Sequence, residues 1–199
     1  MHKCTNMAGF GLIHRLDIDT SGVLALVRGE EARARTMERF ADPEGGIEKF
    51  YDAIVDGVPE PASGEIDRPL SRPDARGRVH VDQERGKAAR TRYATIESFP
   101  EASRVRLELL SGRTHQIRAH LETIGHPLLV DPRYGRRKGW RLVDPRGKLD
   151  ARLRRTPLHA SKLVIPHPRS GARIEIAAPL PGDMRYALEV LRVDAARRR

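Results

Sequence analysis

The chain has 199 residues, of which 39% are hydrophobic and 32% charged, a balance that suits one folded domain with a buried core. Its 37 Lys and Arg against 27 Asp and Glu give a formal net charge of +10, which favours a polyanionic partner over a neutral one. A GC-rich genome would explain the preference for Arg over Lys, but not the excess of positive charge. The single cysteine, Cys4, excludes an internal disulfide, and no apolar run is long enough to cross a bilayer. We therefore expect a cytoplasmic protein without a membrane anchor.

The first half of the chain predicts two strands around one helix. Residues 22–28 (GVLALVR) have the composition of a buried strand. Residues 29–43 predict a helix that carries Ala34, Met37 and Phe40 at helical spacing and is ended by a proline. The alternating run IEKFYDAIVDGVP, which starts at residue 47, predicts a second strand closed by Gly and Pro. The Pro, Gly and charged residues of 59–90 then predict irregular hairpins and loops.

The second half predicts two hairpins and two helices. Residues 91–99 and 103–112 form a plausible hairpin, and residues 159–179 form another that turns at PRSG. Residues 182–192 predict a C-terminal helix. Many hairpins with few helices favour an α+β domain with a mixed, mostly antiparallel sheet over a doubly wound parallel one.

A helix is also predicted over residues 113–125, where it ends at a glycine. The residues that share its apolar face are Ile117, His120, Leu121 and Ile124. A metal site built from His115, His120 and His126 is disfavoured, because histidines five positions apart do not share a helical face. Arg118 on the same helix needs an anion if it is buried, and Asp17 is the obvious counter-charge.

Residues 133–155 stand apart from the rest of the chain because they carry ten Lys or Arg against two Asp. Their apolar residues follow no clear period, so we predict a basic loop inserted in the domain. Tyr134 and Trp140 add stacking surfaces among the cations, a combination that binds unpaired bases and phosphates. The predicted RNA-binding residues of this loop are Arg136, Arg137, Lys138, Trp140 and Arg141.

The most unusual stretch is the polar run HRLDIDTSG at residues 14–22, directly before an apolar segment. Turn chemistry explains Thr20, Ser21 and Gly22, since hydroxyls accept backbone hydrogen bonds and glycine supplies an unusual φ. It explains Arg15 and Asp17 poorly. These two residues are therefore candidates for chemistry.

Three motifs, HRLDIDTSG, EKFYDAIVDG and LLSGRTHQIRAHLETIGHPLLVDPRYG, closely resemble the RluA-type pseudouridine synthases, enzymes that isomerise uridine in structured RNA. The resemblance runs in order from residue 11 to residue 181, so it covers most of the chain. It implies the pseudouridine synthase catalytic fold, an rRNA or tRNA substrate, and a reaction that needs no cofactor and no metal. It also implies one catalytic domain over residues 1–199 that is shortened at its N-terminus and has no separate N-terminal RNA-binding domain. We expect a monomer.

The resemblance assigns roles to individual residues. Asp17 resembles the catalytic aspartate, and Tyr51 the ring that packs on the target base and helps in proton removal. Arg118 resembles the partner that holds the catalytic carboxylate. The residues that resemble substrate-binding positions are Arg15, which would enter the space left by the extruded nucleotide, Ile117, which would form the pocket floor, and Arg113 and His115.

Two other interpretations remain open at this point. A glycosidase would use Asp17 and Asp19 as paired carboxylates, but residues two apart share a face only without the turn that follows them. The second interpretation is an RNA-binding module that has the same fold but has lost catalysis. Sequence does not distinguish attack of the aspartate on C1′ from removal of a sugar proton in a glycal route.

Overall fold

The computed structural model describes residues 9–42, 44–143 and 150–198. Its centre is a seven-stranded sheet in the order β11-β10-β4-β7-β6-β5, with β2 pairing with β10 off this path. The strands are β2 (Ser21–Gly22), β4 (Glu48–Asp56), β5 (Ser63–Asp67), β6 (Arg90–Ser98), β7 (Ala102–Leu109), β10 (Leu158–Pro166) and β11 (Arg173–Ala177). All neighbours are antiparallel except β2 and β10. The predicted α+β fold with a mixed, mostly antiparallel sheet is confirmed.

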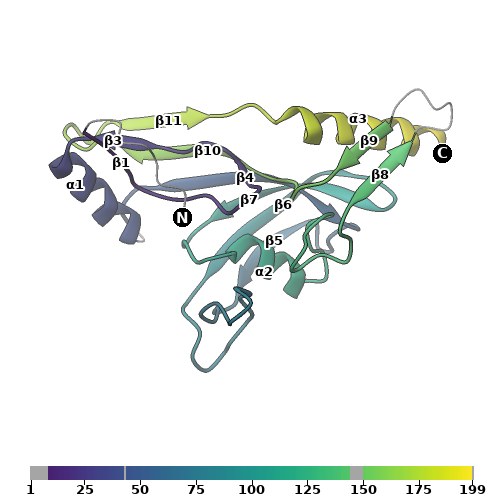
Figure 1. Ribbon diagram of the computed structural model, residues 1–199, viewed down its shortest axis with the longest axis horizontal. Helices are drawn as coiled ribbons and strands as arrows, with labels where there is room; N and C mark the ends of the chain where they lie inside the picture. The colour runs from purple at the N-terminus through teal and green to yellow at the C-terminus, as the bar shows by residue number, and fades with distance from the viewer. Residues whose placement is uncertain (1–8, 43, 144–149, 199) are drawn as a thin grey trace.

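Three helices and two small strand pairs surround this sheet (Figure 1). At one end lie α1 (Glu30–Ala41) and the pair β1 (Phe10–Leu12) with β3 (Leu26–Arg28). At the other end lie α3 (Gly182–Arg197) and the pair β8 (Trp140–Val143) with β9 (Asp150–Leu153). The short helix α2 (Gln116–Thr123) follows β7. Among the described helices, none is long and apolar enough to span a membrane.

Strand β4 is the central element because its two faces pack on two different cores. Alternate residues of a strand point to opposite faces. Accordingly, Ile54 belongs to the core formed with α3, including Met184, whereas Ala53 and Val55 belong to the core formed with α2, including Leu121. The sheet is thus buried on both sides at this point, and β4 carries residues from the interior toward α1.

Both predicted hairpins are present, as β6–β7 and β10–β11, and the predicted helices are α1, α2 and α3. Two details differ. The run 22–28 does not form one strand. Gly22 ends β2, which pairs with β10, and only residues 26–28 form the separate strand β3. In α1 Thr36 is buried and Phe40 packs against the core, whereas Met37 is 45% exposed. The predicted apolar face is therefore correct for Phe40 and wrong for Met37.

The prediction of a basic loop over residues 133–155 is also wrong, although residues 144–149 lie outside the described part. The segment contains the hairpin β8–β9, which packs against α3. Trp140 and Tyr134 are only 5% and 3% exposed, so neither ring offers a surface for base stacking. The apolar positions of the two strands, including Leu153 and Ala151, alternate over so few residues that their period is hard to see between the charges.

Candidate active site

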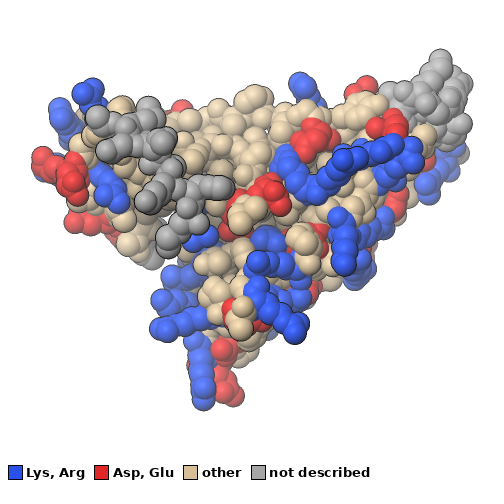
Figure 2. All heavy atoms as spheres, in the orientation of Figure 1, with Lys and Arg blue, Asp and Glu red and all other residues tan. Residues whose placement is uncertain are grey.

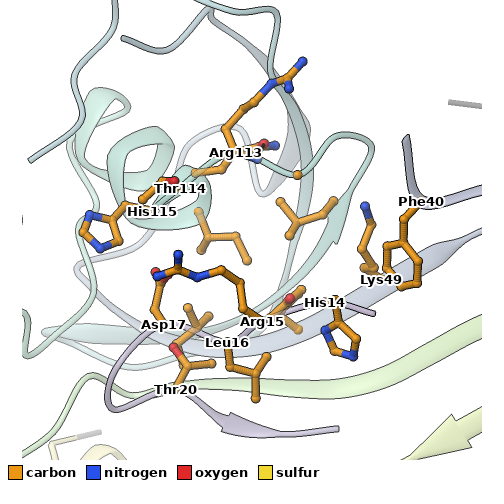
Figure 3. Close-up of a pocket in the computed structure, with 16 residues that line it drawn as sticks. His14, Arg15, Leu16, Asp17, Thr20, Phe40, Lys49, Arg113, Thr114 and His115 are labelled. Atoms are coloured by element: carbon orange, nitrogen blue, oxygen red, sulfur yellow. Dashed lines mark hydrogen bonds between the residues drawn. The ribbon is translucent and has the colours of Figure 1, made fainter. Parts of the chain in front are cut away.

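A cavity of about 290 Å³ opens where the polar turn before β2, strand β4 and the loop between β7 and α2 meet (Figure 3). The lining is mixed. Polar residues of the turn and the loop face apolar side chains such as Leu16, Leu109, Ile117 and Leu158. Asp17, Arg15, Tyr51, Arg113 and His115 all line this one cavity, so the structure brings residues of three distant motifs together.

The turn after Asp17 aims its carboxylate at the cavity. The Thr20 amide donates to the Asp17 carbonyl at 3.1 Å, and Asp19 has a φ of 71°. Gly22 has a φ of 120°, and a Cβ there would lie 2.2 Å from the Ala160 carbonyl oxygen. The prediction that Gly22 supplies an unusual φ is therefore confirmed, and the close approach to β10 fixes where the turn ends.

The two hydroxyls of the turn do not act as predicted. The Ser21 hydroxyl lies 3.0 Å from His159 Nδ1 rather than bonding to the turn's own backbone. The Thr20 hydroxyl is buried and has no hydrogen-bond partner among the described residues. The turn is therefore held by its backbone, by its pairing with β10, and by a hydrogen bond that Arg155 Nη1 donates to the Asp19 carbonyl at 2.9 Å.

Arg118 is the buried cation of the site, but the carboxylate that fixes it is Asp131. Arg118 donates from Nε and Nη2 to the two carboxylate oxygens of Asp131, both at 2.7 Å. The Asp17 carboxylate lies 3.8 Å from Arg118 Nη1, within ion-pair range but beyond hydrogen-bond distance. Arg118 thus presents one edge to Asp131 and the other to Asp17. The expectation that Asp17 is the main counter-charge is corrected accordingly.

The charge state of this pair follows from its contacts. Burial raises the pKa of Asp131, but hydrogen bonds from Arg118 and from the backbone amides of Arg133 and Tyr134 outweigh it and hold the pKa below its usual value. Burial lowers the pKa of Arg118, and the bonds to Asp131 more than offset this. Both groups are ionised at neutral pH, so Arg118 offers Asp17 a fixed positive charge.

Tyr51 lies on β4 and lines the same cavity. Burial and the nearby Asp17 carboxylate raise the pKa of its phenol to about 12. A phenolate is therefore disfavoured at neutral pH, and Tyr51 presents a neutral ring with a hydroxyl donor. In that state Tyr51 is better suited to pack on a flat nucleobase than to act as a general base.

The loop before α2 is positioned by Gln116. Its side-chain oxygen accepts from the Arg113 amide at 3.0 Å and from the Ser111 hydroxyl at 2.8 Å, and its amide nitrogen donates to the Arg90 carbonyl. His115, in the left-handed conformation, begins α2, and its Nδ1 lies 3.1 Å from the Tyr134 hydroxyl. Arg113 is exposed at the mouth of the cavity. The loop is thus rigid where it contacts the cavity.

The end of the cavity away from Asp17 is formed by His14, Phe40 and Lys49. The rings of His14 and Phe40 stack at 5.6 Å with an interplanar angle of 12°. His14 Nε2 accepts from the Ala25 amide at 2.9 Å, so this imidazole is neutral. Burial, and then the charge of Lys49, lower the pKa of His14, in agreement with that state.

The histidines considered above as metal ligands do not come together. Among the residues that the structure describes, no three His, Cys, Asp or Glu side chains are grouped so as to hold a metal ion. His120 is fully buried and bonded to Thr91 and to the Arg68 carbonyl, which is a structural role.

Asp131 and Lys49 are two charged residues of the site to which the sequence assigns no role. Asp131 stands in the quoted segment HPLLVDPRYG, directly after a buried apolar run, and that position is the signal that points to it. Lys49 precedes Tyr51 by two, the spacing that places two residues on one face of a strand. The site thus combines a carboxylate beside a fixed guanidinium, an aromatic ring and a basic mouth. This combination suits an anionic substrate that carries a flat ring.

Comparisons with known proteins show the family of the chain. The profile of the RNA pseudouridylate synthase family matches residues 3–123. The chain belongs to that family, as the resemblance to RluA-type enzymes predicts.

Particular relatives cover almost the whole chain. Ribosomal large subunit pseudouridine synthase D of Escherichia coli K12 is 38% identical over 92% of this chain. An uncharacterised RNA pseudouridine synthase of Mycobacterium bovis is also 38% identical over 92%. The chain spans 56% of the length of each of these two relatives. Among solved structures, human RNA pseudouridylate synthase domain containing 4 superimposes with a TM-score of 0.72 at 25% identity, over 92% of this chain and 76% of that one.

Proposed function

We propose that this protein isomerises uridine to pseudouridine in structured ribosomal or transfer RNA. The observation that carries the proposal is the position of Asp17, which faces the cavity between the Tyr51 ring and the Arg118 guanidinium. The family and the relative named for the ribosomal large subunit support an RNA substrate. That the protein is a cytoplasmic monomer, with residues 1–199 as one catalytic domain, stays a prediction.

The reaction exchanges one bond to the sugar for another. The N1–C1′ bond breaks, the uracil rotates, C5 joins C1′, and C5 loses its proton while N1 gains one. Asp17 attacks C1′ or removes a sugar proton, and both routes need a carboxylate beside the ribose. The atoms balance without an external group or a redox step, so the proposal invokes no cofactor.

The other residues of the cavity bind and orient the nucleotide. Tyr51 packs on the base, and Ile117 forms the apolar floor under it. Arg118 holds the ionised Asp17 carboxylate in place through its charge. Extruding a base from a helix costs a few kcal/mol, and stacking and intercalating groups offset this cost. Arg15, which is exposed at the mouth, fits the intercalating role, while Arg113 and His115 lie where the flanking backbone would pass.

The surface that would hold the rest of the RNA includes more than the predicted segment. Arg136 and Arg137 both pair with Asp56, and Arg141 pairs with Asp150. The most available cation there is Lys138, followed by Arg136, whose side chain stays 69% exposed. A second set lies on the segment between β5 and β6, which projects below the sheet in Figure 1 and is rich in Lys and Arg in Figure 2. Its exposed cations are Arg68, Arg72, Arg76, Arg85 and Lys87.

Tritium release from RNA labelled at uridine C5 tests the proposal. We expect release by the native chain from a 23S ribosomal RNA or transfer RNA transcript, and a loss of about 10³-fold or more in Asp17→Asn. Asp19→Asn is the matched control, because Asp19 lies in the same turn but is exposed and does not line the cavity. RNA binding without release by the native chain would favour a binding module instead, and equal losses in both variants would favour paired carboxylates.

A further inference from the structure

Of the described residues that line the cavity, Lys49 is the cation to which the proposed reaction gives no role. It lies two residues before Tyr51 on β4, so both side chains lie on the same face of the sheet. Its ammonium reaches across the cavity toward the loop before α2, since a Cβ on Gly112 would lie 3.7 Å from Lys49 Nζ. Figure 3 shows Lys49 and Asp17 on opposite sides of the cavity.

The charge of Lys49 has no acidic partner within the described part of the chain. Among the described residues no carboxylate forms an ion pair with its ammonium, and Nζ lies 5.8 Å from the centre of the Phe40 ring. Burial lowers the pKa of Lys49 from its usual value. Holding an unpaired cation partly out of water is unfavourable, so a compensating anion is expected when the cavity is occupied.

Two anions could reach this position, a phosphate of the RNA backbone or the uracil ring itself. Arg15 and Arg113 are exposed at the mouth, where strongly hydrated phosphates would remain in contact with water. Lys49, in contrast, is half-buried beside Phe40 and along the face that carries Tyr51. If the base of a nucleotide packs on Tyr51, the group that faces Lys49 would therefore be the carbonyl edge of the base and not the phosphate of the nucleotide.

We infer that Lys49 is a further catalytic residue, which donates a hydrogen bond to a carbonyl oxygen of the target uracil and stabilises the negative charge that the ring carries during the reaction. This inference rests on the proposed function. When the N1–C1′ bond breaks, its electron pair leaves with the ring and spreads over N1 and the two carbonyl oxygens. When C5 joins C1′, the ring supplies the electron pair, C5 later gives up its proton, and N1 takes one up. The uracil ring therefore carries negative charge whether Asp17 attacks C1′ or removes a sugar proton.

Single-turnover rates at saturating 23S ribosomal RNA transcript, with tritium at uridine C5, test this role. Removing one preorganised donor to a developing anion typically slows the chemical step by about 10²–10³-fold. We expect a loss of that size in Lys49→Met, an RNA dissociation constant within about 3-fold of native, and partial recovery in Lys49→Arg. Lys162→Met is the matched control, because Lys162 also lies over a phenylalanine ring, Phe50, but outside the cavity. Thermal unfolding of each variant verifies that it is folded.

A transcript made with 5-fluorouridine gives a readout that a structural role would not change. Fluorine withdraws electrons and stabilises the uracil anion intrinsically, so the loss in Lys49→Met, measured as rearranged nucleoside, should shrink. Weakened RNA binding and a reduced salt dependence with an undiminished single-turnover rate would assign Lys49 to a phosphate and overturn the inference alone. No release by the native chain would overturn the proposed function, and this inference with it.

Discussion

Asp131 and Arg118 form the buried ion pair on which the position of Asp17 depends. Replacing Asp131 with Asn would leave the Arg118 charge without its close partner, which typically costs about 3–5 kcal/mol for a buried pair. We expect the free energy of unfolding, measured in urea, to fall by about that amount. Asp150→Asn, which breaks only exposed pairs with Arg141 and Arg152, should have a much smaller effect. Equal effects in the two variants would show that the Asp131 pair is not critical.

The residues of the cavity could be predicted from the sequence to different extents. Asp17, Tyr51 and Arg118 stand in motifs that the resemblance identifies. In the structure Asp17 and Tyr51 line one cavity, and Arg118 lies 3.8 Å from the Asp17 carboxylate. The sequence suggests only Asp17 as the counter-charge of Arg118 and does not indicate Asp131, because the fold alone sets the distances between these side chains. Trp140 was misjudged because a charged neighbourhood conceals that its ring packs in the core.

At the scale of the element, the turn between β1 and β2 is fixed by Gly22. Alanine there would combine a φ of 120° with a Cβ 2.2 Å from the Ala160 carbonyl oxygen, so β2 and β10 would have to separate. We expect Gly22→Ala to destabilise the protein by about 2–4 kcal/mol and to lower the rate of tritium release. Gly171→Ala is the control, since Gly171 has a φ of 72° and nothing within 4 Å. A loss no larger than that of the control would mean that the close approach is relieved cheaply.

The elements themselves were largely predictable, because hairpins and amphipathic helices follow from local periodicity. The exceptions have tertiary causes. Strand β2 is only two residues long and exists because β10 pairs with it in parallel, a contact between residues far apart in the chain. The hairpin β8–β9 is defined by its packing on α3, which local charge composition does not indicate.

For the whole molecule, three buried or half-buried histidines set a pH limit on stability. Burial lowers the pKa of His14, His115 and His120 below the ordinary value of 6.5. Such groups stabilise the fold fully above pH 6.5, and this stability is lost as the pH falls toward their lower folded pKa. We expect the urea midpoint to fall as the pH is lowered from 7.5 to 5.5. The fall should be smaller in His120→Gln than in the native protein, and it should be the same as native in His80→Gln, because His80 is exposed. An unchanged midpoint would contradict the assignment.

The basic surface predicts how RNA affinity depends on salt. Each lost phosphate contact should reduce the slope of log affinity against log salt by about 0.7–0.9. We expect a reduced slope in Arg136→Gln with Lys138→Gln and in Arg72→Gln with Arg76→Gln, because all four side chains are exposed. Arg35→Gln, on the exposed face of α1, is the control. A native slope in both double variants would exclude these surfaces from the RNA interface.

The central claim is that the Asp17 carboxylate performs the chemistry rather than binding the RNA. The most direct test incubates the native chain and Asp17→Asn with the same 23S ribosomal RNA transcript, measures binding, and analyses the digested nucleosides by chromatography. We predict pseudouridine from the native chain, none from the variant, and similar affinity for both. Pseudouridine from Asp17→Asn, or none from a native chain that binds the transcript, would contradict the account.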